Sequence, residues 1–183
     1  MTLEEAKVAA RKAALTRRRA AHGPHPAAGH LSGFLAGHRG VAVAGYMPIN
    51  SEIDPIPAME EAAAHGPVGV PVIEAAGRPL KFARWEPGMA LKEGAFKARI
   101  PVEPVFMTPD IVIVPLLAFT RGGGRLGYGG GFYDRTLEGL RAARPTLAAG
   151  FAYAAQEAQT LPLEPTDQPL DLIITETEII DLR

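Results

Sequence analysis

The chain has no cysteine among its 183 residues and no long hydrophobic run. The absence of cysteine excludes disulfide bonds, thiolate catalysis and cysteine-ligated zinc sites. No apolar run approaches the roughly 18 residues of a membrane span, and no secretory signal follows the N-terminus, so we expect a cytoplasmic protein without membrane contact. A formal net charge of −1 gives no general attraction to nucleic acid, which is therefore not expected as a partner.

Few residues are available for covalent or zinc chemistry. Ser32 and Ser51 are the only serines, and neither stands in the G-x-S-x-G motif of a serine hydrolase. His22 and His25 flank a Gly-Pro turn, but no third zinc ligand is close in sequence. The Walker motif G-x-x-x-x-G-K-[ST] is absent. Residues 122–127 match G-x-G-x-x-G only formally, because they do not open a helix as a dinucleotide fold requires.

The most informative segment runs from Arg125 to Arg135 and reads RLGYGGGFYDR. Four of the five residues from Gly127 to Gly131 are glycines, which let the backbone turn sharply and let a ligand approach the main chain. The segment follows the β-branched run Ile111–Val114 and precedes helix-compatible residues from Phe132 to Leu140. Exposed N–H groups ahead of such a helix indicate a phosphate-binding site.

Two side chains of this segment strengthen the phosphate interpretation. Arg125 supplies a fixed cation whose fork geometry suits phosphate oxygens. Asp134 supplies a hard carboxylate suited to Mg²⁺ beside those phosphates. The alternative is a turn that merely connects two elements, but a simple connection would not need so many glycines, because each costs backbone entropy.

The rest of the chain alternates strand-like and helix-like segments. Thr2 and Glu5 form a capping box, so a helix should begin near Leu3, and Gly23-Pro24 should end it. Residues 87–109 are rich in Gly and Pro and predict a long excursion over the surface. Further helices are expected at 25–38, 56–65 and from 132, and strands at 41–46, 68–72, 80–85, 111–114, 147–151 and 172–175.

This alternation predicts a single α/β domain over residues 1–183, with three Rossmann-like layers and a largely parallel sheet. Ligands of such sheets bind beyond the carboxyl ends of the strands. The strand ends at Tyr46, Val114 and Phe151 should therefore face one crevice. Glu52 follows the first of these ends and is interpreted either as a ligand-binding carboxylate or as a helix-capping or solvated loop residue.

Basic residues are concentrated in the first helix. Lys7 and Arg11 are spaced i, i+4 and share one helix face. They are interpreted either as a solvated basic face or, given the glycine loop, as cations that reach the outer phosphates of a nucleotide. Arg17, Arg18 and Arg19 are expected at the surface.

The Arg125–Arg135 segment resembles the signature of the 5-formyltetrahydrofolate cyclo-ligases, also called 5,10-methenyltetrahydrofolate synthetases. The similarity extends upstream through Val114–Phe119 and downstream to Leu161–Glu164, Asp167 and 171–176. The resemblance implies ATP- and Mg²⁺-dependent conversion of 5-formyltetrahydrofolate to 5,10-methenyltetrahydrofolate, with release of ADP and phosphate. Such a reaction needs positioning and charge neutralisation more than a protein nucleophile.

The resemblance also implies roles for individual residues. For catalysis these are Arg125, Tyr133 and Asp134, and for Mg²⁺ they are Asp134 and Asp171, with Asp167 as an alternative structural partner. For ATP they are Lys7, Arg11, Arg125, Leu126, Gly127, Tyr128, Gly129, Gly130, Gly131, Phe132 and Tyr133. For the folate they are Met47 and Glu52. Trp85, Tyr128, Phe132 and Tyr153 are further folate candidates, because a flat pterin ring would stack on an aromatic surface. Trp85 has a second interpretation, because a lone tryptophan is most often a core residue.

The chain departs from the family pattern around the expected phosphate site. Thr120 replaces a common Asp, Thr166 replaces a common His, and the segment around Lys97 is altered. A non-catalytic regulator that binds a nucleotide or RNA through the basic helix is therefore kept as an alternative function. A phosphosugar isomerase is a third possibility, but no acid/base pair suits it. We expect a monomer or a weak homodimer.

Overall fold

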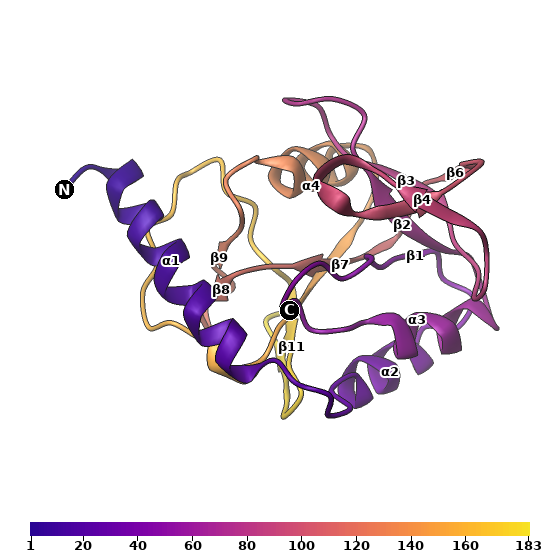
Figure 1. Ribbon diagram of the computed structural model, residues 1–183, viewed down its shortest axis with the longest axis horizontal. Helices are drawn as coiled ribbons and strands as arrows, with labels where there is room; N and C mark the ends of the chain where they lie inside the picture. The colour runs from indigo at the N-terminus through magenta and orange to yellow at the C-terminus, as the bar shows by residue number, and fades with distance from the viewer.

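The computed structural model describes all residues from 1 to 183 and contains one eight-stranded sheet. Its strand order is β12-β11-β10-β7-β1-β2-β3-β6 (Figure 1). The five strands from β11 to β2 in this order are parallel, and β12, β3 and β6 are antiparallel to their neighbours. The strands of this sheet are β1 (Val43–Ala44), β2 (Val68–Val72), β3 (Lys81–Arg84), β6 (Phe106–Met107), β7 (Ile111–Pro115), β10 (Leu147–Phe151), β11 (Leu172–Ile174) and β12 (Ile179–Asp181).

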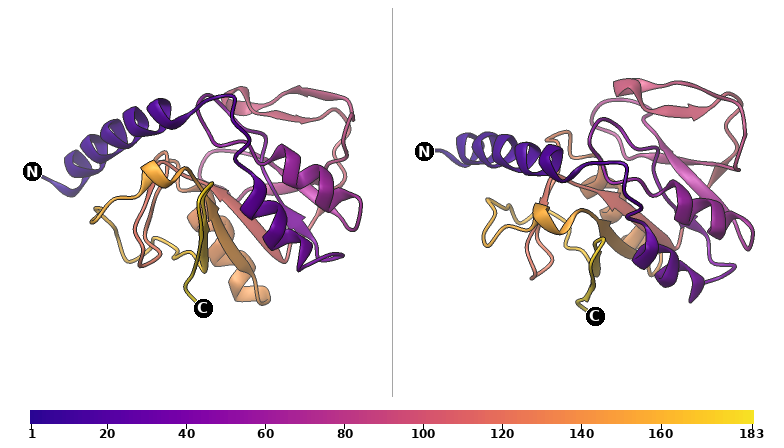
Figure 2. Two further views of the ribbon diagram at one scale, coloured as in Figure 1. Left: turned by 90° about the horizontal axis from the view of Figure 1, so that it is seen from below. Right: turned by 60° about the horizontal axis from the view of Figure 1, so that its bottom comes forward.

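Helices cover both faces of the sheet, which confirms the predicted three-layer α/β fold. On one face lie α2 (Gly29–Ala36) and α3 (Ile56–Ala63), and on the other lies α4 (Phe132–Ala143) (Figures 1 and 2). Successive side chains of a strand point to opposite faces. Accordingly Ile111 and Ile113 of β7 pack in the core beneath α2 and α3, whereas Val112 and Val114 pack in the core beneath α4.

The first helix, α1 (Leu3–Ala21), stands beside these layers (Figure 2). It begins with the predicted capping box: the Glu5 N–H donates to Thr2 Oγ1 at 3.1 Å, and the Thr2 N–H donates to the Glu5 carboxylate at 3.0 Å. Ala14 packs in a small core with Leu117 and Leu126. Those two residues belong to or adjoin a separate hairpin, formed by β8 (Ala118–Phe119) and β9 (Arg125–Leu126).

The turn of this hairpin contains Gly122 and Gly124, the first two glycines of the formal G-x-G-x-x-G match. The Thr120 N–H donates to Gly124 O at 3.0 Å, and the Gly124 N–H donates to Thr120 Oγ1 at 3.1 Å. Thr120, which departs from the family pattern, therefore closes this turn. Because these glycines form a hairpin turn, the segment that formally matches the dinucleotide motif does not open a helix.

The prediction of a surface excursion over residues 87–109 is wrong in part. The segment forms a hairpin from β4 (Leu91–Glu93) and β5 (Arg99–Pro101), joined by the 3-10 turn η1 (Ala95–Lys97), and then strand β6 at the sheet edge. Strand β12 was not predicted either. These strands have two or three residues each, which is too few for a periodic pattern. β4 and β5 pair with each other, β12 pairs with β11, and β6 pairs with β3.

The remaining helices differ from prediction only in their bounds, and a second 3-10 turn, η2 (Ala154–Gln156), follows β10. The strand expected at 41–46 pairs only at Val43–Ala44. None of the helices combines the length and the apolarity that a membrane-spanning helix requires.

Candidate active site

The carboxyl ends of β1, β7 and β10 lie at one edge of the sheet, as predicted. Strand β7 pairs in parallel with both β1 and β10, so the segments that follow these strands leave the sheet on the same side. The segment after β1 carries Ser51 and Glu52, and the segment after β7 carries Leu116. The loop of residues 127–131, here called the glycine loop, lies between β9 and α4 at this edge (Figure 1).

The glycine loop needs glycine at two positions, because both have a positive φ and a side chain close to where a Cβ would lie. Gly129 has φ +98°, and a Cβ there would lie 3.2 Å from the guanidinium carbon of Arg11. Gly131 has φ +69°, precedes the first turn of α4, and would place a Cβ 2.6 Å from the guanidinium of Arg135. No side chain caps this helix start. The N–H groups of the first turn are therefore left for solvent or a ligand.

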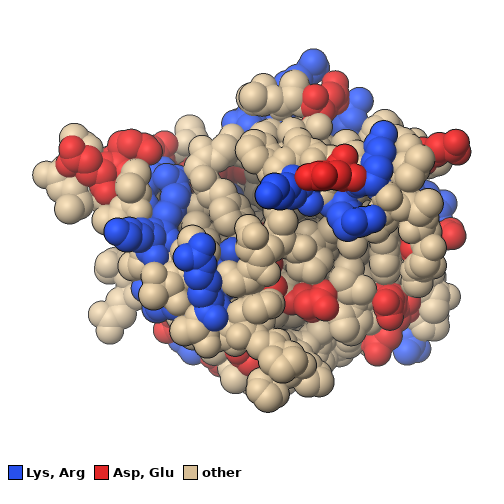
Figure 3. Space-filling model, viewed as in Figure 1, with Lys and Arg blue, Asp and Glu red and all other residues tan.

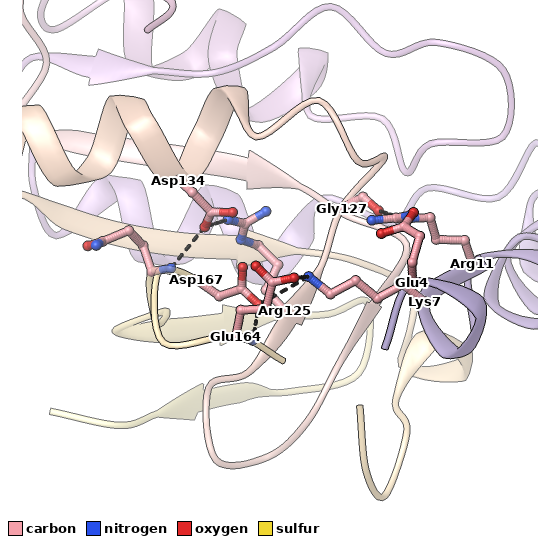
Figure 4. Close-up of polar contacts among 9 residues, drawn as sticks. Glu4, Lys7, Arg11, Arg125, Gly127, Asp134, Glu164 and Asp167 are labelled. Carbon is pink, nitrogen blue, oxygen red and sulfur yellow. Dashed lines mark hydrogen bonds and ion pairs between the residues drawn. The ribbon is translucent and has the colours of Figure 1, made fainter. Parts of the chain in front are cut away.

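Basic side chains lie along α1, and Figure 3 shows Lys and Arg gathered on this side of the molecule. The Arg11 Nε donates to Gly127 O at 3.1 Å, and its Nη1 lies 3.8 Å from Glu4. The Lys7 Nζ lies 3.1 Å from Glu164 and 3.8 Å from Asp167 (Figure 4). The two cations thus lie beside the loop, each with a carboxylate as its present partner.

Arg125 occupies the inner side of the same region. It is 9% exposed and forms an ion pair with Asp134 of α4 (Figure 4). Its Nε is buried without a hydrogen-bond partner, and so is the hydroxyl of Tyr133. Burial, followed by the charge of Glu52, raises the pKa of Tyr133, so its phenol is a neutral donor. An unpaired buried donor costs about 1–3 kcal/mol, which a ligand with acceptor oxygens would recover.

Glu52 forms the other end of the site. It is 4% exposed, its Oε1 accepts from the Ile49 N–H at 2.8 Å, and its Oε2 accepts from the Tyr128 hydroxyl at 2.6 Å. Burial raises the pKa of this carboxyl, while the hydrogen bonds from Tyr128 and Ile49 and the charge of Arg18 act against the rise. Glu52 is thus a buried carboxylate, and the interpretation as a solvated loop residue is wrong.

The prediction that Arg18 lies at the surface is also wrong. Arg18 is 1% exposed, its Nε donates to Ser51 Oγ at 2.9 Å, and its Nη1 donates to Leu116 O at 3.4 Å and to the Tyr128 hydroxyl. The signal was present in the sequence, because positions 7, 11, 14 and 18 share one helical stripe. Only the first two were interpreted as parts of that stripe.

The other expected folate contacts are placed differently. Trp85 is 5% exposed and packs in a core with Met59 and Val70, with Met47 at its margin, which favours the core interpretation of the tryptophan. Tyr153 is 6% exposed, and its hydroxyl lies 3.1 Å from Nδ1 of His22. Tyr128, by contrast, is 52% exposed although its hydroxyl points inward. The glycine loop therefore offers the accessible aromatic surface.

The structure does not assemble Asp134 and Asp171 into one metal site. Asp171 immediately precedes β11, and its carboxylate accepts from the Ala148 N–H at 2.8 Å and from Arg141 at 2.9 Å. Arg141 is in the last turn of α4 and Asp134 in the first, roughly 10 Å apart along the axis. No group of three or more His, Asp or Glu side chains is arranged to hold a metal ion. Asp171 therefore has a structural role at the start of β11.

Two surface hollows lie away from these residues. One, of about 260 Å³, is lined by residues of α2 and α3 and by His38, Arg39 and His65. The other, of about 400 Å³, lies between β3, β6 and α4. Neither contains a predicted site residue.

Comparison with known proteins agrees with the sequence resemblance. The sequence model of the 5-formyltetrahydrofolate cyclo-ligase family matches residues 4–176. The 5-formyltetrahydrofolate cyclo-ligase of Escherichia coli strain K12 is 34% identical over 145 residues, which cover 75% of this chain and 79% of the relative. That of Mycolicibacterium smegmatis is 33% identical over 157 residues, or 79% of each chain.

Solved structures have the same fold. The 5,10-methenyltetrahydrofolate synthetase of Aquifex aeolicus superposes with a TM-score of 0.68 at 27% identity, covering 100% of this chain and 94% of that one. The synthetase of Mycoplasma pneumoniae gives a TM-score of 0.66 over 93% of this chain and 98% of that one, but at 24% identity it supports the fold alone. Sequence and fold together show that the chain belongs to the 5-formyltetrahydrofolate cyclo-ligase family of enzymes.

Proposed function

We propose that the protein converts 5-formyltetrahydrofolate to 5,10-methenyltetrahydrofolate with ATP, releasing ADP and phosphate. One observation carries the proposal beyond family membership: the glycine loop connects a cationic end to a buried carboxylate. Arg11 contacts Gly127 of the loop, and Tyr128 of the same loop contacts Glu52. A single loop thus touches both regions that two different substrates would occupy.

The cationic end suits the phosphates of ATP. Lys7, Arg11 and Arg125 supply positive charge, and the uncapped first turn of α4 supplies N–H donors. The unpartnered Arg125 Nε and Tyr133 hydroxyl are two further donors. In the proposed reaction the formyl oxygen attacks the γ-phosphorus and ADP leaves. N10 then attacks the activated carbon, the carbon–oxygen bond breaks, and phosphate leaves together with the N10 proton. The protein's task is to align the atoms and neutralise charge.

The buried end suits the pterin. An ionised carboxylate accepts hydrogen bonds and donates none, so Glu52 selects N–H donors. The partly exposed faces of Tyr128 and Phe132 offer flat surfaces against which a ring system can stack. We accordingly assign ATP to the α1 side of the glycine loop and the folate to the Glu52 side.

Mg²⁺ is proposed only together with the nucleotide. Asp134 fits such a role in part, because its Oδ1 accepts from Arg125 and from the Gln168 N–H at 2.8 Å while Oδ2 accepts no hydrogen bond from the protein. When bound there, the ion would neutralise phosphate charge. Asp171 is not included, since its carboxylate is held by Arg141 and Ala148.

A regulator that binds RNA through α1 is less well supported. Lys7, Arg11 and Arg18 turn inward toward the site and contact Glu164, Gly127 and Ser51. Of the six cations of the helix, only Lys12, Arg17 and Arg19 are then left for the outward phosphate-binding stripe that nucleic-acid binding requires.

The decisive experiment is to mix the protein with Mg-ATP and 5-formyltetrahydrofolate and to follow the absorbance band of the methenyl product. Product formation that needs all three components, with one ADP released per product, is the expected result. The Arg125→Ala variant is the matched control and should form little or no product. Tight binding of ATP and formylfolate without product formation would contradict the proposal and favour the regulator.

A further inference from the structure

Arg18 is the most buried charged residue of the chain, at 1% exposure. Its guanidinium contacts Ser51 after β1, Leu116 after β7 and Tyr128 in the glycine loop. These three segments form the carboxyl edge of the sheet and are far apart in sequence. One side chain from α1 therefore sets their relative positions.

The direct partners of Arg18 are a hydroxyl, a carbonyl and a phenol, all neutral. A buried cation without a countercharge costs several kcal/mol, even after relaxation. The negative group that faces it is Glu52, on the far side of the Tyr128 hydroxyl. The two opposite charges are thus joined through one phenol.

This arrangement fixes the direction of the Tyr128 proton. An arginine is a donor only, so the phenol oxygen accepts from Arg18 and its single hydrogen must go to Glu52 Oε2. The Ile49 N–H occupies Oε1 from the other side. A carboxylate has about four lone-pair sites, so about two remain for a ligand, and their directions are set.

We infer that Arg18 is a positioning residue for the folate: through Tyr128 it holds Glu52 as an oriented, acceptor-only carboxylate. The inference rests on the proposed function, because it assumes that the folate binds at Glu52. Arg18 touches neither the glycine loop backbone nor Asp134, so its removal should affect the folate far more than ATP.

Electrostatics give this role a separate signature. The titratable groups that act on or face Glu52 are Arg18 from α1, Tyr128 from the glycine loop, Tyr46 from the end of β1 and Tyr133 from α4. Of these, Arg18 is the cation. Without it, burial would raise the pKa of Glu52 further. Folate binding that depends on ionised Glu52 would then be lost at a higher pH.

The test compares Arg18→Gln and Tyr128→Phe with Arg19→Gln, which removes an exposed arginine one residue away. Calorimetry would measure 5-formyltetrahydrofolate and a non-hydrolysable ATP analogue separately, from pH 5.5 to 8.5. We expect Arg18→Gln to weaken folate binding by about tenfold or more, as for loss of a charge-assisted hydrogen bond, and to change ATP-analogue binding by less than about twofold. The acid limb of the pH profile, that is, the fall of folate affinity at low pH, should move to higher pH.

Tyr128→Phe leaves Arg18 and the docking of α1 intact and should shift the acid limb in the same direction. It therefore decides the question if Arg18→Gln does not fold. Equal weakening of both ligands by Arg18→Gln, or an unchanged acid limb in Tyr128→Phe, would overturn the inference and leave Arg18 with an anchoring role alone. A wild-type protein that forms product while these variants bind folate normally would refute the inference but not the proposed function.

Discussion

At the cationic end of the site Lys7 contacts Glu164, whose side chain is 41% exposed, and Arg11 contacts Glu4, whose side chain is 74% exposed. At the buried end Glu52 is held by Tyr128 and Ile49, and Arg18 lies behind them at 1% exposure. The first set of contacts can exchange partners, because exposed ion pairs are worth only about 0–1 kcal/mol. The second set is fixed before any ligand arrives, and pre-organisation lowers the entropy cost of binding.

This difference suggests a division of labour. A nucleotide phosphate would displace Glu164 and Glu4 and take over their cations, so ATP binding would be an exchange of anions. The folate would enter a site whose acceptor directions already exist. Mutations at the cationic end should therefore change ATP affinity, and mutations at the buried end should change folate affinity. The effects should also differ in size and in sign.

The largest effect is expected for Glu52→Gln. The amide keeps the shape but loses the charge, and one of its two polar atoms becomes a donor, which conflicts with the donors of the pterin. We expect folate affinity to fall by about 30- to 100-fold, the equivalent of about 2–3 kcal/mol for a hydrogen bond to a charged group. Calorimetry with each ligand alone checks this. If Glu52→Gln weakened ATP and spared the folate, the two ends would be assigned in reverse.

The second prediction concerns the pH dependence of folate binding. Burial raises the pKa of Glu52 above its ordinary value, and the ionised form is the acceptor. Folate affinity should therefore be highest above the raised pKa and should decline as the pH falls through it. This decline should occur at a higher pH than for an exposed glutamate, whose pKa is about 4.3. Affinity titrations across this range check the direction. Binding that stays constant until an ordinary glutamate protonates would show that burial does not control the carboxylate.

The third prediction is for Lys7→Ala, at the exchangeable end. Loss of one charge-assisted phosphate contact should weaken ATP binding by about tenfold or more and leave folate binding nearly unchanged. The matched control is Lys12→Ala, an exposed cation on the opposite side of α1. Equal weakening of ATP by the two variants would mean that the helix acts only as a diffuse charge.

The fourth prediction has the opposite sign. Glu164→Gln removes a carboxylate that competes with phosphate for Lys7, so ATP should bind more tightly, by about two- to fivefold, given the small worth of a partly exposed ion pair. The gain should shrink as salt is added, because salt screens exposed charges. Weaker ATP binding in this variant would show that Glu164 supports Lys7 and does not compete for it.

The smallest effect is expected for Thr2→Ala. It removes one half of the capping box and should cost about 0.5–1 kcal/mol of local helix stability. Because Lys7 and Arg11 are on that helix, ATP affinity should fall by less than about threefold, and folate affinity should not change. Thermal melts and ATP calorimetry together check this. A large loss of folate affinity would show that the two ends are not independent.

Local sequence patterns predicted the fold where the cause is local. The β-branched run at Ile111–Val114 and the capping box at Thr2 and Glu5 gave correct elements, because strand burial and helix capping depend on neighbouring residues. Strands β4, β5, β6 and β12 escaped prediction because each has only two or three residues, too few for a periodic pattern. The helical stripe shared with Lys7 and Arg11 could have placed Arg18 on the inner side of α1. Its burial depends on Ser51, Leu116 and Tyr128, which are far from it in sequence. The resemblance assigned Asp171 to a metal, but Arg141 holds it.

Helix α1 supplies none of the fully buried members of the two cores that cover the sheet. It docks through the small core around Ala14 and through Arg18. We therefore expect α1 to open locally while the layered sheet stays folded. Its amide hydrogens should then exchange faster than those of β7, and both ligands should slow that exchange. The N-terminal helix would then be the last part of the chain to fold. The strength of substrate binding would depend on how stably this helix is docked.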